Sequence, residues 1–146
     1  MRLLLSLLLV TVVGRAVPGE ALVDLEPALA RAREQKKHVF VEFTGSDWCV
    51  PCIKFEQNVM ADEAFARFLS RRFVAVRLDI PYRKKIDPAV KKRNEKLAGK
   101  YAVKIYPTFL VLDADGREVG RREGYLGEAP AEFQKIVTAL VRGPGR

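Results

Sequence analysis

Apolar residues along the chain follow two spacings, which predict alternating strands and helices. Continuous apolar runs rich in β-branched and aromatic residues predict strands, whereas apolar residues that recur every three or four positions predict helices. The predicted strands are residues 38–44, 73–79, 108–113 and 118–123. The predicted helices begin at Asp24, near Cys49, at Asp62, at Asp87 and at Pro130. The apolar run at 73–79 is typical of a strand that is buried on both faces.

The ends of these segments carry signals of their own. Asp24, Asp62 and Asp87 stand where helix N-caps are expected, because an Asp side chain accepts a hydrogen bond from an N–H of the first turn. The turn at residues 113–116, Asp-Ala-Asp-Gly, predicts that the third and fourth strands form a hairpin. Helices and strands that alternate before a hairpin and a final helix predict an α/β domain with helices on both faces of its sheet.

The beginning of the chain is typical of a secretory signal peptide. Arg2 precedes an apolar stretch at residues 3–13. As a helix, such a stretch spans only about 18 Å, against about 30 Å for the bilayer core. A basic start, a short apolar run and a small-x-small site are the three parts of an export signal. The alternative is an uncleaved membrane anchor.

Two cleavage sites fit this signal, one after Ala16 and one after Ala21. We favour Ala21, because Pro18 and Gly19 break any helix just upstream. The expected organisation is therefore a signal peptide at 1–21 and a domain at 22–146, in a periplasmic or secreted protein. No cysteine lies near either site, which excludes a lipid anchor on a new N-terminal cysteine.

Composition narrows the class of protein. The chain has 146 residues, of which 49% are hydrophobic and 30% charged, which suits one compact domain and argues against disorder. Its 2 cysteines are too few for a disulfide-dense scaffold or a four-cysteine zinc site. A single histidine argues against a polyhistidine metal centre.

The formal net charge is +8, and it falls to +7 without residues 1–21, whose Arg2, Arg15 and Glu20 sum to +1. Nucleic-acid binding would need this excess to form a stripe with a matching motif. The basic clusters are instead scattered, at 71–72, 83–85, 91–93 and 121–122. We therefore expect a solvated basic surface and no nucleic-acid partner, although such a surface also attracts acidic partners or anionic lipid headgroups.

Cys49 and Cys52 form a C-x-x-C motif directly after a predicted strand and turn, at the start of a helix. Unsatisfied N–H groups and the helix dipole stabilise a thiolate at that place, so the first cysteine is expected to face outward and attack. The second, one helical turn further on, can reach the resulting mixed disulfide. Three alternatives are a zinc pair, a structural disulfide and unrelated buried thiols. The zinc pair lacks further ligands, since the one histidine, His38, lies inside a strand.

Three segments together resemble the thioredoxin superfamily. They are the strand at 39–43, the motif Trp48-Cys-Val-Pro-Cys52, and Tyr106-Pro-Thr108 ahead of a strand. The sequence at 43–49, Phe-Thr-Gly-Ser-Asp-Trp-Cys, further resembles the exported thioredoxin-like branch, which includes the C-terminal domain of the thiol reductant DsbD. The resemblance covers roughly residues 24–142 and implies a thioredoxin-like fold, with a central mixed β-sheet flanked by helices on both faces.

The resemblance also assigns roles at the matching positions. Cys49 would be the nucleophile and Cys52 the resolving thiol. Pro107 would be the family's cis-proline, lying against the disulfide. Trp48, Tyr106 and Thr108 would contact the substrate, Tyr106 through its backbone.

Two features depart from the family pattern. The family often has a buried acid that moves a proton from the second cysteine, and Glu42 is the nearest match, although the turn after it is one residue longer. Glu42 has a second interpretation, as a strand residue that faces a neighbouring Lys or Arg. The segment at 82–92 is longer and more basic than in a minimal thioredoxin, and it either alters partner choice or forms a solvated loop.

The leading hypothesis is thus an exported, monomeric thiol–disulfide oxidoreductase that needs no bound cofactor or metal. Its partners would be protein thiol or disulfide substrates and a redox partner that recycles it, with no membrane insertion after signal cleavage. The alternative is a peptide-binding or chaperone module on the same fold, which has no need of both cysteines. Copper handling by the thiolates is disfavoured, because only Met1 and Met60 offer thioethers and no histidine lies near the motif.

Overall fold

The computed structural model describes residues 21–142. The helices are α1 (Leu25–Gln35), α2 (Val50–Phe55), α3 (Glu63–Arg72), α4 (Pro88–Lys100) and α5 (Pro130–Val141), with a π-helical segment, η1 (Glu56–Met60), directly after α2. The strands are β1 (His38–Thr44), β2 (Phe73–Asp79), β3 (Thr108–Leu112) and β4 (Glu118–Glu123). Every predicted strand and helix is present, and η1 is the one addition among these residues.

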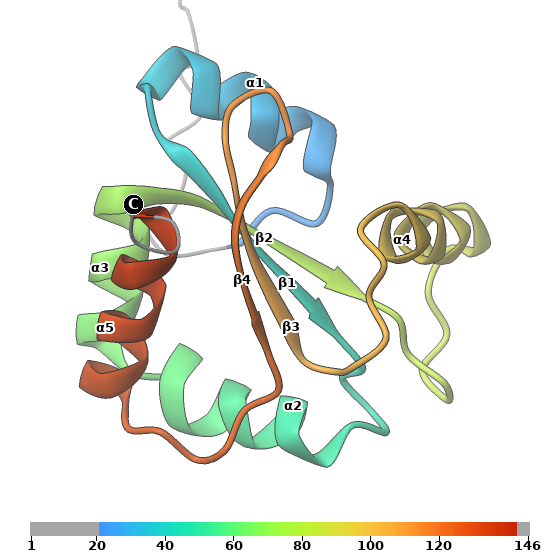
Figure 1. The fold of residues 1–146 in the computed structure, drawn as a ribbon. Coiled ribbons are helices and arrows are strands. Elements are labelled where there is room, and N and C mark those ends of the chain that lie inside the picture. The colour runs from blue at the N-terminus through green and yellow to red at the C-terminus, as the bar shows by residue number, and fades with distance from the viewer. Residues whose placement is uncertain (1–20, 143–146) are drawn as a thin grey trace, which may run out of the picture.

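The strands form a mixed sheet in the order β2-β1-β3-β4. β1 and β2 are parallel, and the β1–β3 and β3–β4 pairs are antiparallel, so the predicted hairpin is confirmed. α1 and α4 cover one face of the sheet, while α2, α3 and α5 cover the other (Figure 1). The expected α/β architecture, with helices on both faces of a mixed sheet, is therefore confirmed.

The aspartates expected at helix starts cap the helices as predicted. Asp24, Asp62 and Asp87 each accept a hydrogen bond from an N–H in the first turn of the helix that follows. A side-chain acceptor there satisfies one of the donors that a helix N-terminus leaves free. These caps fix where α1, α3 and α4 begin.

One expectation about burial is wrong. β2 is an edge strand, and its residues alternate between buried and half-buried positions instead of being buried on both faces. Within residues 21–142, the outer side of β2 pairs only through the isolated bridge between Leu22 and Val76. The half-buried positions include Arg77, whose side chain lies on the same face of the sheet as α2 and reaches Glu56 of η1.

Candidate active site

Cys49 and Cys52 are joined in a disulfide, with an S–S distance of 2.08 Å. Cys49 is the N-cap of α2, and Cys52 lies in its first turn, so the N–H of Cys52 donates to the sulfur of Cys49 at 3.3 Å. Pro51 occupies the first turn, where no backbone donor is needed. The arrangement directs a backbone donor at the first sulfur, which favours a thiolate there when the pair is reduced.

The two cysteines differ less in exposure than the sequence suggested. Cys49 is 4% exposed and Cys52 is 1% exposed, so the expected outward position of Cys49 is wrong for the oxidised form. The neighbouring side chains are the exposed ones, with Trp48 at 44% and Val50 at 60%. The cysteines are therefore distinguished by their places on the helix rather than by their burial.

The turn before the motif fixes the indole of Trp48. Its Nε1–H donates to the carbonyl of Ile80, at the end of β2, at 2.8 Å. Gly45 makes room for the ring, because a Cβ at that position would overlap the indole. Trp48 also lies edge-on to Tyr106, with the ring centroids 5.4 Å apart. This contact brings the segment around Pro107 to the C-x-x-C motif, although some 55 residues separate them in sequence.

The Tyr106–Pro107 peptide bond is cis, as the resemblance implied. The carbonyl of Pro107 accepts from the N–H of Gly124, which attaches this segment to the end of β4. Thr108 is fully buried, and its hydroxyl donates to the carbonyl of Ile105 at 2.6 Å. The side chain of Thr108 is therefore engaged within the loop.

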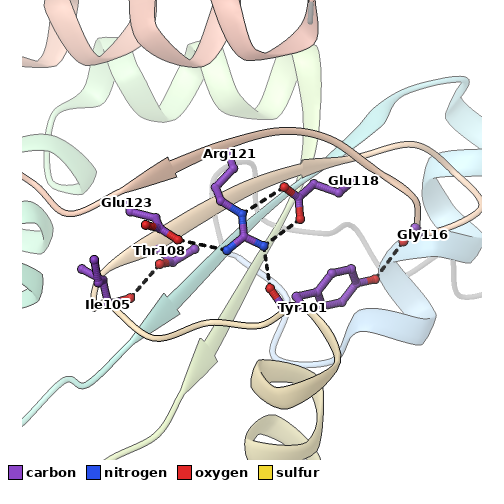
Figure 2. A network of polar contacts seen from close by, with 7 residues as sticks. All are labelled: Tyr101, Ile105, Thr108, Gly116, Glu118, Arg121 and Glu123. Atoms are coloured by element: carbon purple, nitrogen blue, oxygen red, sulfur yellow. Dashed lines mark hydrogen bonds and ion pairs between the residues drawn. The ribbon is translucent and has the colours of Figure 1, made fainter. Parts of the chain in front are cut away.

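A polar network holds the other end of the same loop (Figure 2). Arg121 on β4 bonds the carboxylates of Glu118 and Glu123 and donates to the carbonyl of Tyr101, where α4 ends. The hydroxyl of Tyr101 donates to the carbonyl of Gly116 in the hairpin turn. The loop that carries Pro107 is therefore tied at both ends to the β3–β4 hairpin.

Glu42 lies on β1 with only 1% of its surface exposed. It points to the sheet face that α2 covers, since Phe40, two residues earlier, packs among Phe55 and its neighbours there. Burial raises the pKa of Glu42 from 4.5 to about 7, against the lowering effect of Arg77. Neither carboxyl oxygen has a hydrogen-bond partner among the described residues.

Arg77 is the residue paired with Glu42 across the β1–β2 ladder, and its Nε lies 3.9 Å from the carboxylate. Its guanidinium makes the closer contact with Glu56, at 3.0 Å. Glu56 lies one helical turn after Cys52, so this ion pair connects the face below the disulfide to the edge of the sheet. Glu42 is therefore buried on the sheet face that α2 covers, and it also faces an arginine, as its second interpretation expected.

Asp47, in the turn before the motif, is the second carboxylate beside the site. It accepts hydrogen bonds from the backbone N–H groups of Tyr82 at 2.8 Å, Arg83 at 2.6 Å and Lys84. These donors, that of Tyr82 foremost, lower the pKa of Asp47 below its usual value. Ser46 makes a second link to the end of β2 through the carboxylate of Asp79.

The sequence alone does not single out Arg77, Asp47 or the role of Glu56. Arg77 and Glu56 meet Glu42 only through the strand pairing and the helix, which local spacing does not specify. A signal for Asp47 did exist, since an Asp in a turn is a frequent acceptor for backbone N–H groups. Its partners lie 35 residues or more away, however, and their identity needs the fold.

The longest helix of residues 21–142 is α4, with 13 residues, and no helix there has the length and apolarity needed to cross a bilayer. In the same region, no three His, Cys, Asp or Glu side chains gather as a metal site would require. The predicted signal peptide lies outside the described residues, except for Ala21.

Comparison with known proteins agrees with this geometry. A family model described as a thioredoxin-like domain matches residues 25–140. Disulfide bond reductase DsbH of Chlamydia pneumoniae is 28% identical over 113 residues, covering 77% of this chain and 68% of that protein. A solved structure of a DsbH oxidoreductase superposes with a TM-score of 0.75 at 24% identity, over 89% of this chain and 92% of that chain.

The DsbD C-terminal domain of Neisseria meningitidis, in its oxidised form, superposes with a TM-score of 0.59 at 17% identity. That match covers 82% of this chain and 98% of the domain. At these identities the two superpositions establish the fold, and the fold expected from the resemblance is confirmed.

Proposed function

This chain belongs to the thioredoxin-like domain family, and on that premise we propose that it is an exported thiol–disulfide oxidoreductase that acts on protein thiols and disulfides. The observation that carries the proposal is the Cys49–Cys52 disulfide at the start of α2, beside Trp48 and the cis Tyr106–Pro107 bond. A C-x-x-C pair on this fold is the chemistry expected of a relative of a disulfide bond reductase.

The reaction proceeds by two exchanges of sulfur bonds. In the reducing direction, the Cys49 thiolate attacks a substrate disulfide, an S–S bond forms to Cys49, and one substrate sulfur leaves as a thiolate that takes up a proton. The Cys52 thiol then loses its proton and attacks the Cys49 sulfur, which reforms the Cys49–Cys52 bond and releases the second substrate thiol. The substrate gains two electrons and the protein loses two, and a dithiol partner returns them.

Glu42 is proposed as the group that exchanges the proton of Cys52. A carboxyl with a pKa of about 7 is partly ionised at neutral pH, so it can both accept and return a proton. Its burial on the face that α2 covers supports this role. Arg77 and Glu56 act through Glu42 as positioning residues.

The substrate would lie across the rim formed by Trp48 and Tyr106, beside Pro107. Trp48 is 44% exposed and Tyr106 is half-buried against it, so part of this aromatic pair is accessible to an extended substrate segment. Thr108 stabilises the loop that carries Tyr106 and Pro107, through its hydrogen bond to Ile105. The proposal further includes cleavage of residues 1–21 and a monomeric mature protein at 22–146.

Trapping of the mixed disulfide tests this function. Replacing Cys52 with Ser removes the tethered thiol that resolves the intermediate, so exported partner proteins should accumulate on Cys49 as adducts. The adducts should be visible on a non-reducing gel and should vanish when reductant is added. Cys49→Ser, the matched control, should trap little, because Cys52 has no comparable backbone donor at its sulfur.

The same pair of variants separates the oxidoreductase from a peptide-binding or chaperone module. If neither variant traps a partner while binding of an unfolded peptide persists unchanged in both, the cysteines do not act on substrates. The proposed function would then be replaced by the binding module.

A further inference from the structure

The segment that follows β2 presents three consecutive cations to solvent beside the disulfide. Arg83, Lys84 and Lys85, here called the basic loop, are all exposed. Within residues 21–142, none of the three forms an ion pair with a carboxylate. Asp87, the acid that follows them, caps α4 through the N–H of Ala89. The positive charge of the basic loop is therefore left for an external partner.

The position of the basic loop is fixed by its backbone. Asp47 accepts from the N–H groups of Tyr82, Arg83 and Lys84, so its carboxylate faces the loop backbone while the cationic side chains remain free. Three hydrogen bonds from consecutive residues to one carboxylate hold a loop that has no helix or strand of its own. Asp47 is two residues before Cys49, so the anchor and the nucleophile belong to the same turn.

The basic loop continues the exposed rim around the disulfide. Tyr82, directly before the basic loop, is 82% exposed. Val50 and Ile105 are also exposed, and they are the chain neighbours of Cys49 and Tyr106. The hydrogen bond from Trp48 to Ile80 joins the rim to the segment leading into the loop. In Figure 1 the segment after β2 and the turn from β1 to α2 lie at the same end of the sheet.

We propose that the basic loop is a docking surface for acidic segments of the polypeptides that exchange disulfides with Cys49. The inference rests on the proposed function and specifies its substrate class. Charge complementarity raises the rate of encounter, and its effect falls steeply with salt. A polypeptide is favoured over an anionic membrane because the loop is anchored to the turn that carries the nucleophile, where the reacting chain must lie.

The test uses two synthetic peptides, each with one internal disulfide, whose flanking residues are either Asp or the neutral isostere Asn. At low salt the reduced protein should reduce the Asp peptide about fivefold faster than the Asn peptide, and the ratio should approach one at high salt. Lys84→Glu with Lys85→Glu should reverse the preference. Arg71→Glu with Arg72→Glu changes the net charge equally, at the end of α3 where β2 begins, and should keep the preference.

Three results would overturn the inference while leaving the proposed function intact: equal rates for the two peptides, a preference that survives in the basic-loop variant, or an equal loss in both double variants. Binding to phosphatidylglycerol vesicles that depends on the basic loop, with no peptide preference, would assign it to a membrane surface instead. If the parent protein exchanges with neither peptide in either direction, the proposed function itself fails.

Discussion

Glu42 on β1 and Asp47 in the turn that leads to the disulfide are carboxylates five residues apart, and their pKa values move in opposite directions. Glu42 is buried and has no hydrogen-bond donor within the described chain, so burial raises its pKa to about 7. Asp47 lies at the surface and accepts three backbone N–H groups, which lower its pKa.

The comparison shows how two carboxylates close in sequence can have different tasks. A carboxyl that burial removes from water keeps its proton until near neutral pH, where it can take part in proton transfer. A carboxylate whose oxygens already accept backbone donors stays ionised and acts as a fixed anchor. Burial for Glu42 and backbone donors for Asp47, rather than distance from the cysteines in sequence, set the pKa of each group.

The largest expected effect comes from Glu42→Gln, measured on the oxidised protein. The folded parent keeps the Glu42 proton up to about pH 7 and the unfolded chain only to about 4.5, so the folded state binds more protons in between. Stability of the parent should therefore fall by roughly 3 kcal/mol as the pH rises through that window. The neutral glutamine should remove this loss, as measured by urea unfolding at pH 4 and pH 8.

Glu63→Gln is the matched control for this measurement. Glu63 is an exposed acid on α3 that pairs with Arg67, and its removal should leave the fall between pH 4 and pH 8 unchanged. If the free energy of unfolding changes between pH 4 and pH 8 by the same amount in Glu42→Gln as in the parent, Glu42 ionises normally.

Much of the fold could be predicted because it depends on local signals. Strands β1 and β3 are rich in β-branched and aromatic residues and are buried on both faces, and the aspartate caps mark helix starts. The Cys49–Cys52 pair was evident from spacing, and the cis bond at Pro107 came from a family resemblance. The wrong expectation about β2 arose because the order of strands in the sheet, rather than the strand's own sequence, decides how far it is buried. β2 is apolar enough for a central strand but lies at the edge, which leaves Arg77 free to meet Glu56.

A smaller effect is expected from Glu56→Gln, which tests the link between Glu42 and the surface. The charge of Glu56 raises the pKa of Glu42, and its carboxylate holds Arg77 at 3.0 Å. Without that charge, Arg77 is left with Glu42 as its carboxylate partner, and the pKa of Glu42 should fall. The loss of stability between pH 4 and pH 8 should then shrink by about 1 kcal/mol, the scale of a partly exposed ion pair.

Carbon NMR of the Glu42 carboxyl, followed through a pH titration, measures this shift directly. Glu63→Gln again serves as the control, since it removes an acid without touching Arg77. A pKa of Glu42 that rises or stays constant in Glu56→Gln would mean that the ion pair with Glu56 does not influence the buried group.

The smallest expected effect on overall stability comes from Asp47→Asn, which removes the carboxylate that holds the basic loop. Arg83 and Lys84 both donate to the same oxygen of Asp47, and an asparagine can present only one oxygen to the three N–H groups. Amide hydrogen exchange of Arg83 and Lys84 should accelerate about tenfold, while urea unfolding stays near that of the parent.

The pH dependence of this anchor should be the reverse of that of Glu42. Because the folded-state pKa of Asp47 is lowered, its bonds to the loop are fully present above its ordinary pKa of 3.8 and are lost only as the pH falls through the lowered value. Protection of the Arg83 and Lys84 amides in the parent should thus be constant between pH 5 and pH 8, where Glu42 titrates.

Asp113→Asn is the matched control for Asp47→Asn, since Asp113 accepts the N–H groups of Asp115 and Arg117 in the distant hairpin turn. The Asp113 substitution should loosen its own turn and leave the amides of the loop after β2 protected. If Asp47→Asn leaves that protection intact as well, the carboxylate is not what holds the basic loop beside the disulfide, and the preference for acidic peptides should then survive the substitution.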